Sequence, residues 1–235
     1  MSDGQIIVTG ASRGIGEAIA IELDRRGFRV AGLSRSGTCP VGSGVVGDMT
    51  DETSIVAAVA KIAANGPIIG LVNNAGAHEA SPSAGLSLAE FEASMRLNAS
   101  SVLVACRETY PHLKRSGDAL IVNIGSFFDK LAVGENLAYC ASKAAVGAMT
   151  RCLAAEWAKD GIRVLDVAPG YIETELNREF LSNPKVQGWL ARRVPIGRAG
   201  AASEVGRLVG ALYAERIGFL TGETIYIDGG QGANL

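Results

Sequence analysis

The stretch Gln5-Ile-Ile-Val-Thr-Gly-Ala-Ser-Arg-Gly-Ile-Gly16 decides the fold of this 235-residue chain. Residues 5 to 9 form a short, mostly apolar and β-branched run, which predicts a buried strand. A glycine-rich turn follows at once, and the apolar spacing of residues 18 to 23 then predicts a helix. A strand, a turn and a helix start in this order let backbone amides approach a pyrophosphate. The sequence therefore predicts that this turn binds a dinucleotide.

The turn has the glycine spacing Gly-x3-Gly-x-Gly in place of the more widely quoted Gly-x-Gly-x2-Gly. Glycines also make ordinary turns, so the prediction depends on the flanking strand and helix. The residues expected to contact the cofactor here are Gly10, Ser12, Arg13, Gly14, Ile15 and Gly16.

The second predicted strand, Phe28–Leu33, ends in Ser34 and Arg35. Folds that bind NAD usually place an acid near this point for the ribose hydroxyls, whereas an arginine suits the 2′-phosphate of NADP. The acid is absent here, and Arg13 offers a second cation in the turn. An alternative interpretation makes Arg35 a solvated loop charge, as most arginines are. We predict NADP(H) as the cofactor, with Ser34 and Arg35 at its phosphate.

Two further strands are expected to end at the same edge of the sheet. Val45–Asp48 leads into a helix that runs to Lys61, and Asp48 either contacts the adenine or caps that helix. The fourth strand, Ile68–Val72, is followed by short polar and small residues, which suit a cofactor that lies across the sheet. The cofactor candidates in these two places are Asp48, Met49, Asn74, Ala75 and Gly76.

Strands alternate with longer helical segments along the chain, which predicts an α/β fold with a doubly wound parallel sheet. The chain contains no internal repeat, low-complexity tract or convincing linker. At this length, a single domain over residues 1–235 is the expectation.

Composition argues against several classes of function. The net charge of −2 favours neither nucleic-acid binding nor membrane-surface binding. No apolar run approaches the length of a membrane span, and Ser2-Asp3-Gly4 does not suggest a secretion signal. The four cysteines fit neither a CxxC pair nor a disulfide framework, and the two histidines are isolated. We therefore expect a cytoplasmic protein with reduced thiols and no metal site.

The second half of the chain contains polar residues in unusual places. Asn98 lies among apolar residues of a helix predicted from about Leu88 to Leu113. A polar amide in such surroundings must find partners, so Asn98 is either a structural hydrogen bonder or the holder of an ordered water. The fifth strand, Ala119–Ile124, brings Ser126 to its carboxyl end, where ligands bind in such sheets.

Tyr139-Cys-Ala-Ser-Lys143 places a phenol and an ammonium group four residues apart. On a helix the two share one face, although such pairs also occur by chance. A free phenol has a pKa of about 10, and a fixed neighbouring cation stabilises the phenolate. Ser126 precedes Tyr139 by 13 residues, and a loop can bring the two hydroxyls together. Since no histidine is placed to serve as its base, we interpret Ser126 as a hydroxyl that orients a carbonyl.

Taken together, these motifs resemble those of the short-chain dehydrogenases/reductases. The resemblance extends from Ile6 to Gly230 in the family's order and spacing, and the C-terminal third looks most like the 3-oxoacyl carrier-protein reductase branch. It depends on Thr9-Gly10-x3-Gly14-Ile15-Gly16, Asn73-Asn74-Ala75-Gly76, Asn98, Ser126, Tyr139-x3-Lys143 and Pro169-Gly170. The resemblance implies a three-layer, Rossmann-type sheet of seven strands and hydride transfer between a nicotinamide and a ketone or secondary alcohol.

The resemblance also implies a role for each candidate residue. Tyr139 would be the general acid of reduction and the base of oxidation, and Lys143 would lower its pKa and bind the nicotinamide ribose. Ser126 would polarise the substrate oxygen, and Asn98 would hold a water that links Lys143 to solvent. The residues implied to line the nicotinamide are Pro169, Gly170, Ile172 and Thr174.

Two features concern the surroundings of this site. Residues 173–193, with a break at Asn183-Pro184, are interpreted as a helical lid over the substrate, the alternative being an ordinary surface excursion. Small residues along the Tyr139 helix pack either against the sheet or against another subunit. Because members of the family commonly pair this helix in dimers and tetramers, a homodimer or homotetramer is expected.

The expected function is that of an NADP-dependent ketoreductase that acts on a small-molecule carbonyl compound. Reduction is favoured because an NADP-preferring enzyme normally meets a reduced cofactor pool. The alternatives are an NAD-dependent alcohol dehydrogenase that works in oxidation and a cofactor-binding regulatory protein without turnover. The residues proposed to contact the substrate are His78, Glu79, Phe127, Phe128, Asp129, Glu135, Asn136 and Tyr171.

Overall fold

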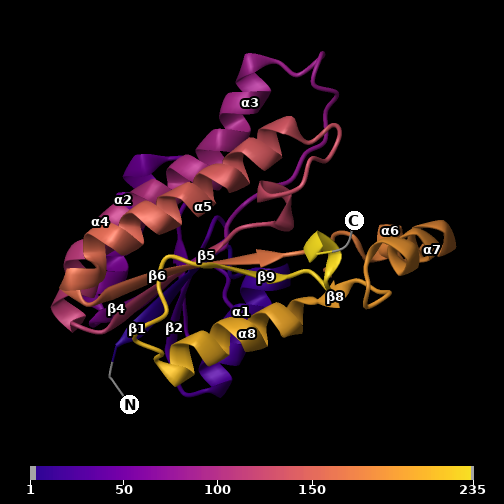
Figure 1. Cartoon of the computed structure of the whole chain (residues 1–235). Helices are drawn as coiled ribbons and strands as arrows, with labels where there is room; N and C mark the ends of the chain where they lie inside the picture. The colour runs from indigo at the N-terminus through magenta and orange to yellow at the C-terminus, as the bar shows by residue number, and fades with distance from the viewer. Residues whose placement is uncertain (1–3, 234–235) are drawn as a thin grey trace.

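A seven-stranded parallel sheet runs through the middle of the structure, a computed structural model that describes residues 4–233 (Figure 1). The strand order is β3-β2-β1-β4-β5-β6-β9, so the direction of winding reverses between β1 and β4. The strands are β1 (Gln5–Thr9), β2 (Arg29–Ser34), β3 (Ser43–Val46), β4 (Ile68–Asn73), β5 (Ala119–Ile124), β6 (Ile162–Pro169) and β9 (Thr224–Ile227). The predicted doubly wound sheet is confirmed. Ser2 and Asp3, which entered the prediction of no secretion signal, lie outside the described residues.

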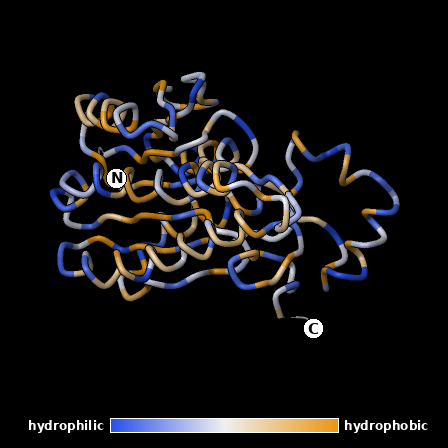
Figure 2. The backbone as a smooth tube through the Cα atoms, turned by 90° about the horizontal axis from the view of Figure 1, so that it is seen from above, coloured by the Kyte–Doolittle hydropathy of each residue, from blue (hydrophilic) through white to orange (hydrophobic). Residues whose placement is uncertain are grey.

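The central strands bury side chains on both faces, which is why they form nearly unbroken apolar runs. Along β1, Ile6 and Val8 pack with α1 (Gly14–Arg25) and α8 (Ala202–Glu215). Ile7 packs into the opposite layer, with α2 (Glu52–Ala64), α4 (Ser101–Ser116) and α5 (Leu137–Trp157). Figure 1 shows these helical layers on the two sides of the sheet, and Figure 2 shows the strands as largely hydrophobic. None of the helices described between residues 4 and 233 has the length and apolarity to cross a bilayer.

The helix predicted from Leu88 to Leu113 is interrupted by one wide turn. α3 covers Leu88–Met95, a π-helical segment covers Arg96–Ser100, and α4 follows. Such turns are rare and frequently occur at functional sites. Here the wide turn contains the buried Asn98. Apolar periodicity predicted the helix but not this turn, because one extra residue per turn hardly alters the pattern over so short a segment.

The segment predicted as a lid lies outside the main sheet. β7 (Ile172–Glu173) pairs with β8 (Gly200–Ala201) in a two-stranded ladder that sequence reasoning missed. Between these strands, α6 (Arg178–Ser182) and α7 (Pro184–Arg193) project from the body of the molecule (Figure 1). Asn183 separates the two helices and caps the second, because its side chain accepts a hydrogen bond from the Lys185 amide. The predicted break at this point is confirmed.

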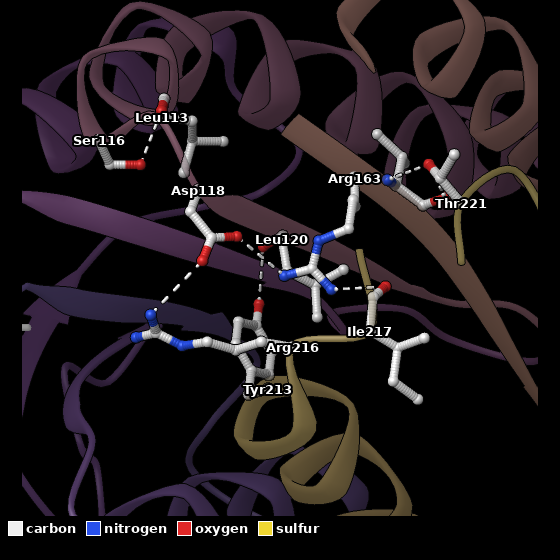
Figure 3. A network of polar contacts seen from close by, with 10 residues as sticks. Leu113, Ser116, Asp118, Leu120, Arg163, Tyr213, Arg216, Ile217 and Thr221 are labelled. Carbon is white, nitrogen blue, oxygen red and sulfur yellow. Dashed lines mark hydrogen bonds and ion pairs between the residues drawn. The ribbon is translucent and has the colours of Figure 1, made fainter. Parts of the chain in front are cut away.

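A polar network fastens the amino-terminal edge of the sheet (Figure 3). The hydroxyl of the buried Tyr213 on α8 donates to the Leu120 carbonyl at 2.9 Å. Asp118 accepts hydrogen bonds from both Arg163 and Arg216. These contacts tie the end of α8 to the starts of β5 and β6, so the opposite edge is the one left open to a ligand.

Candidate active site

The candidate residues meet at the carboxyl-terminal edge of the sheet, beside the reversal of strand order. A cleft of about 390 Å³ opens there, where ligands of doubly wound folds bind. The turn after β1, the ends of β4, β5 and β6, and the first turns of α5 line it. The lining residues that the sequence predicted as catalytic or cofactor-binding are Arg13, Gly14, Ile15, Asn74, Gly76, Ser126, Tyr139, Lys143, Pro169, Gly170, Ile172 and Thr174.

The glycine-rich turn has the shape that a phosphate site requires. Gly10 and Gly14 have φ angles of +68° and +61°, a region that favours glycine. A Cβ on Gly16 would lie 2.2 Å from the Gly10 carbonyl oxygen, so only glycine lets the turn close this tightly. Arg13 occupies the N-cap of α1, but no side chain caps the helix, which leaves its first amides to a ligand. These residues fit the pyrophosphate of a dinucleotide.

Asn74 fastens the end of β4 to this turn. Its side-chain amide donates to the carbonyl oxygens of Thr9 at 3.0 Å and Gly10 at 3.3 Å. The Thr9 hydroxyl in turn accepts hydrogen bonds from the backbone amides of Asn74 and Ala75. Asn74 therefore holds the shape of the cradle, in addition to lining the cleft.

The residues predicted to bind the adenosine phosphate share one corner of the sheet edge. Ser34 is the buried last residue of β2 and pairs with Val46 of β3, and Arg35 next to it is exposed. Asp48 follows closely after Val46 and so reaches the same corner. Met49 is buried in the core beneath it. An exposed cation here is accessible to a phosphate.

Asp48 does not cap the helix that follows it. The cap of α2 is Asp51, whose carboxylate accepts a hydrogen bond from the Thr53 amide at 3.0 Å. Asp48 instead accepts from the amide and the hydroxyl of Thr50, both at 2.8 Å. These bonds, together with the charge of Arg35, hold the pKa of Asp48 below its usual value. The capping interpretation was therefore wrong, and the contact with adenine stays a prediction.

Ser126 and Tyr139 come together in the cleft from two different elements. Ser126 follows β5 and caps the short 3-10 turn Phe127–Asp129, accepting a hydrogen bond from the Phe128 amide. Tyr139 lies in the first turn of α5. Burial raises the pKa of Tyr139, and a hydrogen bond from Ser126 acts in the opposite direction. The fold therefore brings the two hydroxyls into the same cleft, as the 13-residue spacing predicted.

Lys143 lies one helical turn beyond Tyr139, with its ammonium nitrogen 5.7 Å from the centre of the Tyr139 ring. The ammonium is buried and donates to the Ile124 carbonyl at 2.8 Å. Burial lowers the pKa of Lys143 to about 8, and the charge of Asp166 opposes this shift. The resemblance implied a depressed Tyr139 pKa, but the arrangement gives a raised one, because burial of the phenol dominates.

Asn98 ties the π-helical turn to the loop after β4. Its Oδ1 accepts from the Ala77 amide at 2.9 Å, and its Nδ2 donates to the Ala77 carbonyl at the same distance. Nδ2 also donates to the Ser142 hydroxyl at 3.2 Å, beside Lys143 on α5. Asn98 is thus a structural hydrogen bonder, and a water held near Lys143 stays a prediction.

The wall at the end of β6 faces the glycine-rich turn across the cleft. A Cβ on Gly14 would lie 3.5 Å from Cγ2 of Thr174, which brings the phosphate turn and this wall together. Gly170 packs against the residue that follows β9, since a Cβ on Gly170 would lie 2.7 Å from the Asp228 Cα. Asn177 fixes Thr174, since its Oδ1 accepts from the Thr174 amide at 2.8 Å. The predicted phosphate and nicotinamide residues therefore form one continuous site.

The part of the cleft beyond Tyr139 is largely aromatic. The His78 ring meets the Tyr139 ring edge-on, with centroids 4.8 Å apart. Its Nε2 is hydrogen-bonded to Asn136 Oδ1, and Nδ2 of that amide donates to the Gly134 carbonyl at 2.6 Å. The amide oxygen then accepts a hydrogen bond from Nε2 of His78. The proposed substrate residues that line the cleft are His78, Phe127, Phe128 and Tyr171.

Four of the proposed substrate residues do not line the cleft: Asn136 is bonded to His78 behind the lining, and the other three lie elsewhere. Glu79 and Glu135 are exposed and do not line the cleft. The Tyr226 hydroxyl donates to Asp129, at 3.0 and 3.1 Å from its two carboxylate oxygens, on the β9 side of the loop. Sequence could not separate these residues from lining ones, because neighbours in a loop point in different directions. Lining residues that were not among the named candidates are Ala77, Ile124, Gly125, Glu175, Leu176 and Asn177, the last three of which lie within the segment predicted as a lid, residues 173–193.

Comparisons with known proteins agree with this architecture. A family model described as enoyl-(acyl carrier protein) reductase matches residues 10–231. A glucose 1-dehydrogenase of Gluconobacter oxydans is 36% identical over 96% of this chain and 91% of its own. A 3-oxoacyl-[acyl-carrier-protein] reductase of Escherichia coli is 36% identical over 97% of this chain and 98% of its own. The crystal structure of a gluconate 5-dehydrogenase from Burkholderia cenocepacia, in complex with NADP and tartrate, has a TM-score of 0.91 and 30% identity, covering 100% of this chain and 97% of that one.

Proposed function

The chain belongs to the short-chain dehydrogenase/reductase family of oxidoreductases, and on this basis we propose that it uses NADPH to reduce a small-molecule ketone to a secondary alcohol. The observation that supports the proposal most is the meeting of Ser126, Tyr139 and Lys143 in one cleft with the glycine-rich turn. NADPH, when bound, supplies a hydride. The residues that would hold it are those of the turn, Arg35, Asn74, and the wall from Pro169 to Thr174.

Tyr139 donates the proton that the reduced oxygen requires. A phenol whose pKa is raised by burial is protonated at neutral pH, as a general acid must be. Ser126 directs its hydroxyl at the same oxygen and stabilises the charge that develops there. Neither residue needs to form a covalent bond to the substrate.

Lys143 stabilises the phenolate that remains after Tyr139 has given up its proton. Its buried ammonium acts on the ring from 5.7 Å, and charges interact more strongly in such surroundings than in water. The lysine can do this even though the resting phenol has a raised pKa. Asn98 contributes by holding the Ala77 loop and Ser142 in place beside this lysine.

Arg35→Ala is expected to weaken NADPH binding by about 1–3 kcal/mol and to leave NADH binding nearly unchanged. The reason is the loss of a charge-assisted hydrogen bond to the 2′-phosphate, which NADH lacks. Fluorescence titration of both cofactors measures this difference. Arg115→Ala is the matched control, since Arg115 is an exposed arginine that bonds the Pro111 carbonyl on α4. An equal loss for NADPH and NADH in Arg35→Ala would remove the argument for NADP.

The cleft favours a neutral ketone with an apolar substituent. Of the described lining residues, the cations are Arg13 and Lys143, and both are assigned to the cofactor or to catalysis. A carboxylate on the substrate would therefore lack a cation of its own, and Glu175 would repel it. The relatives named above act on sugars, sugar acids or acyl groups by name, so they do not select one substrate.

A second, apolar pocket of about 310 Å³ adjoins the cleft through Tyr171. The Tyr171 ring lies edge-on to Phe127, with centroids 5.1 Å apart, and edge-on to Trp189 at 5.3 Å. These rings form a continuous aromatic surface from the catalytic residues to the space between α6 and α7. Phe180, Leu181, Lys185, Val186 and Leu190 complete the pocket. Apart from the Lys185 ammonium its lining is apolar or aromatic, which suits an alkyl chain or an aryl ring.

A ketone panel with NADPH tests this substrate preference. We expect kcat/KM for long-chain alkyl or aryl ketones to exceed that for polyhydroxylated ketones of similar size by about tenfold or more, the effect of a few apolar contacts. Trp189→Ala should reduce this advantage and leave a short ketone unaffected, whereas Phe219→Ala removes a fully exposed ring outside the cleft. A preference for sugar acids would contradict the assignment.

Two other functions are distinguished by the same panel. Consumption of NAD⁺ with secondary alcohols, but not of NADPH with ketones, would indicate an NAD-dependent dehydrogenase that works in oxidation. NADPH binding without turnover would indicate a regulatory protein. We further propose a homodimer or homotetramer, because α5 exposes Ala144 and Ala148 to a partner while it buries Gly147. A cytoplasmic location is proposed because the four cysteines fit no disulfide framework.

A further inference from the structure

A row of residues on one face of α5 continues inward from the catalytic pair. Tyr139, Lys143 and Gly147 are spaced four residues apart, so they lie one above the other. Gly147 is buried, and two carboxylates occupy the level where its side chain would stand. A Cβ on Gly147 would lie 3.6 Å from Nη1 of Arg151, 3.7 Å from Oδ2 of Asp129 and 3.9 Å from Oδ2 of Asp166, so the Arg151 guanidinium lies beside the two carboxylates. The glycine thus makes room for an acidic pair directly behind the active site.

Asp166 is the residue of this pair that needs an explanation. It lies within β6 and is completely buried, and its Oδ2 accepts a hydrogen bond from the Thr224 hydroxyl at 3.3 Å. Its Oδ1 has no hydrogen-bonding partner within the described part of the chain. A buried carboxylate that is only half satisfied destabilises the fold unless a charge compensates it.

The geometry assigns this compensating charge to Lys143. Its Nζ donates to the carbonyl of Ile124 at 2.8 Å. The next residue, Gly125, lies against the carboxylate, because a Cβ there would be 2.5 Å from Asp166 Oδ1. The ammonium and the carboxylate therefore flank the same short piece of backbone at the end of β5, and glycine at position 125 permits the approach.

We propose that Asp166 is the counter-charge that keeps Lys143 in its ammonium form, which makes Asp166 a positioning residue for the reaction. The catalytic consequence depends on the proposed function, whereas the pairing of the two charges is a property of the chain itself. Asp166 does not touch the cleft, since it is absent from the lining residues.

The other charged groups around the pair act mainly on Asp129. Lys130 and Arg151 favour its ionised form, and Tyr226 donates a hydrogen bond to it. Asp129 in turn repels a charge on Asp166. Arg151 lies at the same level of α5 and favours the ionised form of Asp129, whereas Lys143 is the cation that favours the ionised form of Asp166.

The titration of the two groups is consistent with this pairing. Burial raises the pKa of Asp166 to about 6, and Lys143 opposes the rise. Burial lowers the pKa of Lys143 to about 8, and Asp166 opposes the fall. Both groups are charged between these values; Asp166 becomes neutral as the pH falls below the window, and Lys143 becomes neutral as it rises above. Removing the carboxylate charge should move the Lys143 pKa further down, toward neutral pH.

Carbon-13 NMR of the chain labelled at the ε-carbon of lysine tests the proposal without any turnover. The chain has six lysines, so the Lys143 signal is the one that disappears in Lys143→Met. In wild type this signal should titrate near pH 8, with a second, smaller inflection near pH 6 as Asp166 titrates. In Asp166→Asn, which keeps the side-chain shape, the midpoint should fall by roughly one pH unit, as expected for loss of an opposite charge at a buried site.

Asp129→Asn is the matched control, because it removes a carboxylate from the same pair but should not lower the Lys143 midpoint. An unchanged midpoint in Asp166→Asn, or an equal fall in both variants, would overturn the proposal. If Asp166→Asn does not fold, the titration curve of the Lys143 signal in wild type tests the proposal by itself. A Lys143 signal without the inflection near pH 6 contradicts the pairing. A protein that shows these shifts but never consumes NADPH would contradict the proposed function but not the pairing of the two charges.

Discussion

Tyr139→Phe is expected to lower kcat by about 10²–10⁴-fold, the usual contribution of one positioned proton donor. The variant loses only the hydroxyl, because its ring still packs edge-on against His78 at 4.8 Å and Phe128 at 5.7 Å between centroids. The glycine-rich turn and Asn74 are untouched, so NADPH affinity should stay close to that of wild type. Steady-state rates with an apolar ketone, together with a fluorescence titration of NADPH, measure the two effects separately.

Tyr110→Phe is the matched control for this experiment. It removes the same hydroxyl from a tyrosine on α4, where that group donates to Asp160 at 2.7 Å, outside the cleft. The control should retain the wild-type kcat. A Tyr139→Phe enzyme with wild-type turnover, or one that has lost NADPH binding in proportion to activity, would show that the phenol is not the proton donor.

Lys143→Met is expected to reduce kcat by about 10²–10³-fold, the size of effect seen when one group that stabilises a developing charge is removed. Methionine keeps the length of the side chain but cannot stabilise the Tyr139 phenolate. The wild-type kcat/KM should fall as the pH rises through about 8, because the ammonium, whose pKa burial has lowered, then loses its proton. In Lys143→Met this alkaline limb should be absent, and a pH series of kcat/KM measures both changes.

Lys130→Met provides the comparison. The Lys130 ammonium lies 4.8 Å from the centre of the Tyr226 ring, and it does not line the cleft. Its removal should leave the alkaline limb in place. If Lys143→Met kept both its turnover and the limb near pH 8, the loss of activity at alkaline pH would belong to another group.

Most of the fold could be predicted because the hydrophobic periodicity of strands and helices, and the glycines in the turns between them, are local signals in the sequence. Gln5–Thr9 and Ala119–Ile124 were predicted with the bounds that the structure gives, since each is a short apolar run with an abrupt polar or glycine boundary. The β7–β8 ladder was missed, because strands of two residues have no periodicity to detect. The π-helical turn around Asn98 was missed for a related reason, because it is a single irregular turn inside an otherwise continuous helical pattern.

The sequence predicted which candidate residues meet in the cleft, but not how burial shifts their pKa values. Ser126, Tyr139 and Lys143 were found from residue type and spacing, and the fold brings them together. The raised pKa of Tyr139 depends on how deeply the phenol is buried, which no spacing reveals. Asp166 was not among the candidate residues. The charges near an acid inside a strand cannot be predicted until β6 is placed beside β5 and α5.

The central claim is tested most directly by following deuterium from the nicotinamide of deuterated NADPH into the product of an apolar ketone. The account predicts that wild type consumes NADPH and ketone in equal amounts and that the alcohol carries deuterium on its carbinol carbon. Tyr139→Phe should form almost none of this product while still binding the cofactor. Cofactor binding without label transfer to any alkyl or aryl ketone, or label transfer that Tyr139→Phe performs as well as wild type, would contradict it.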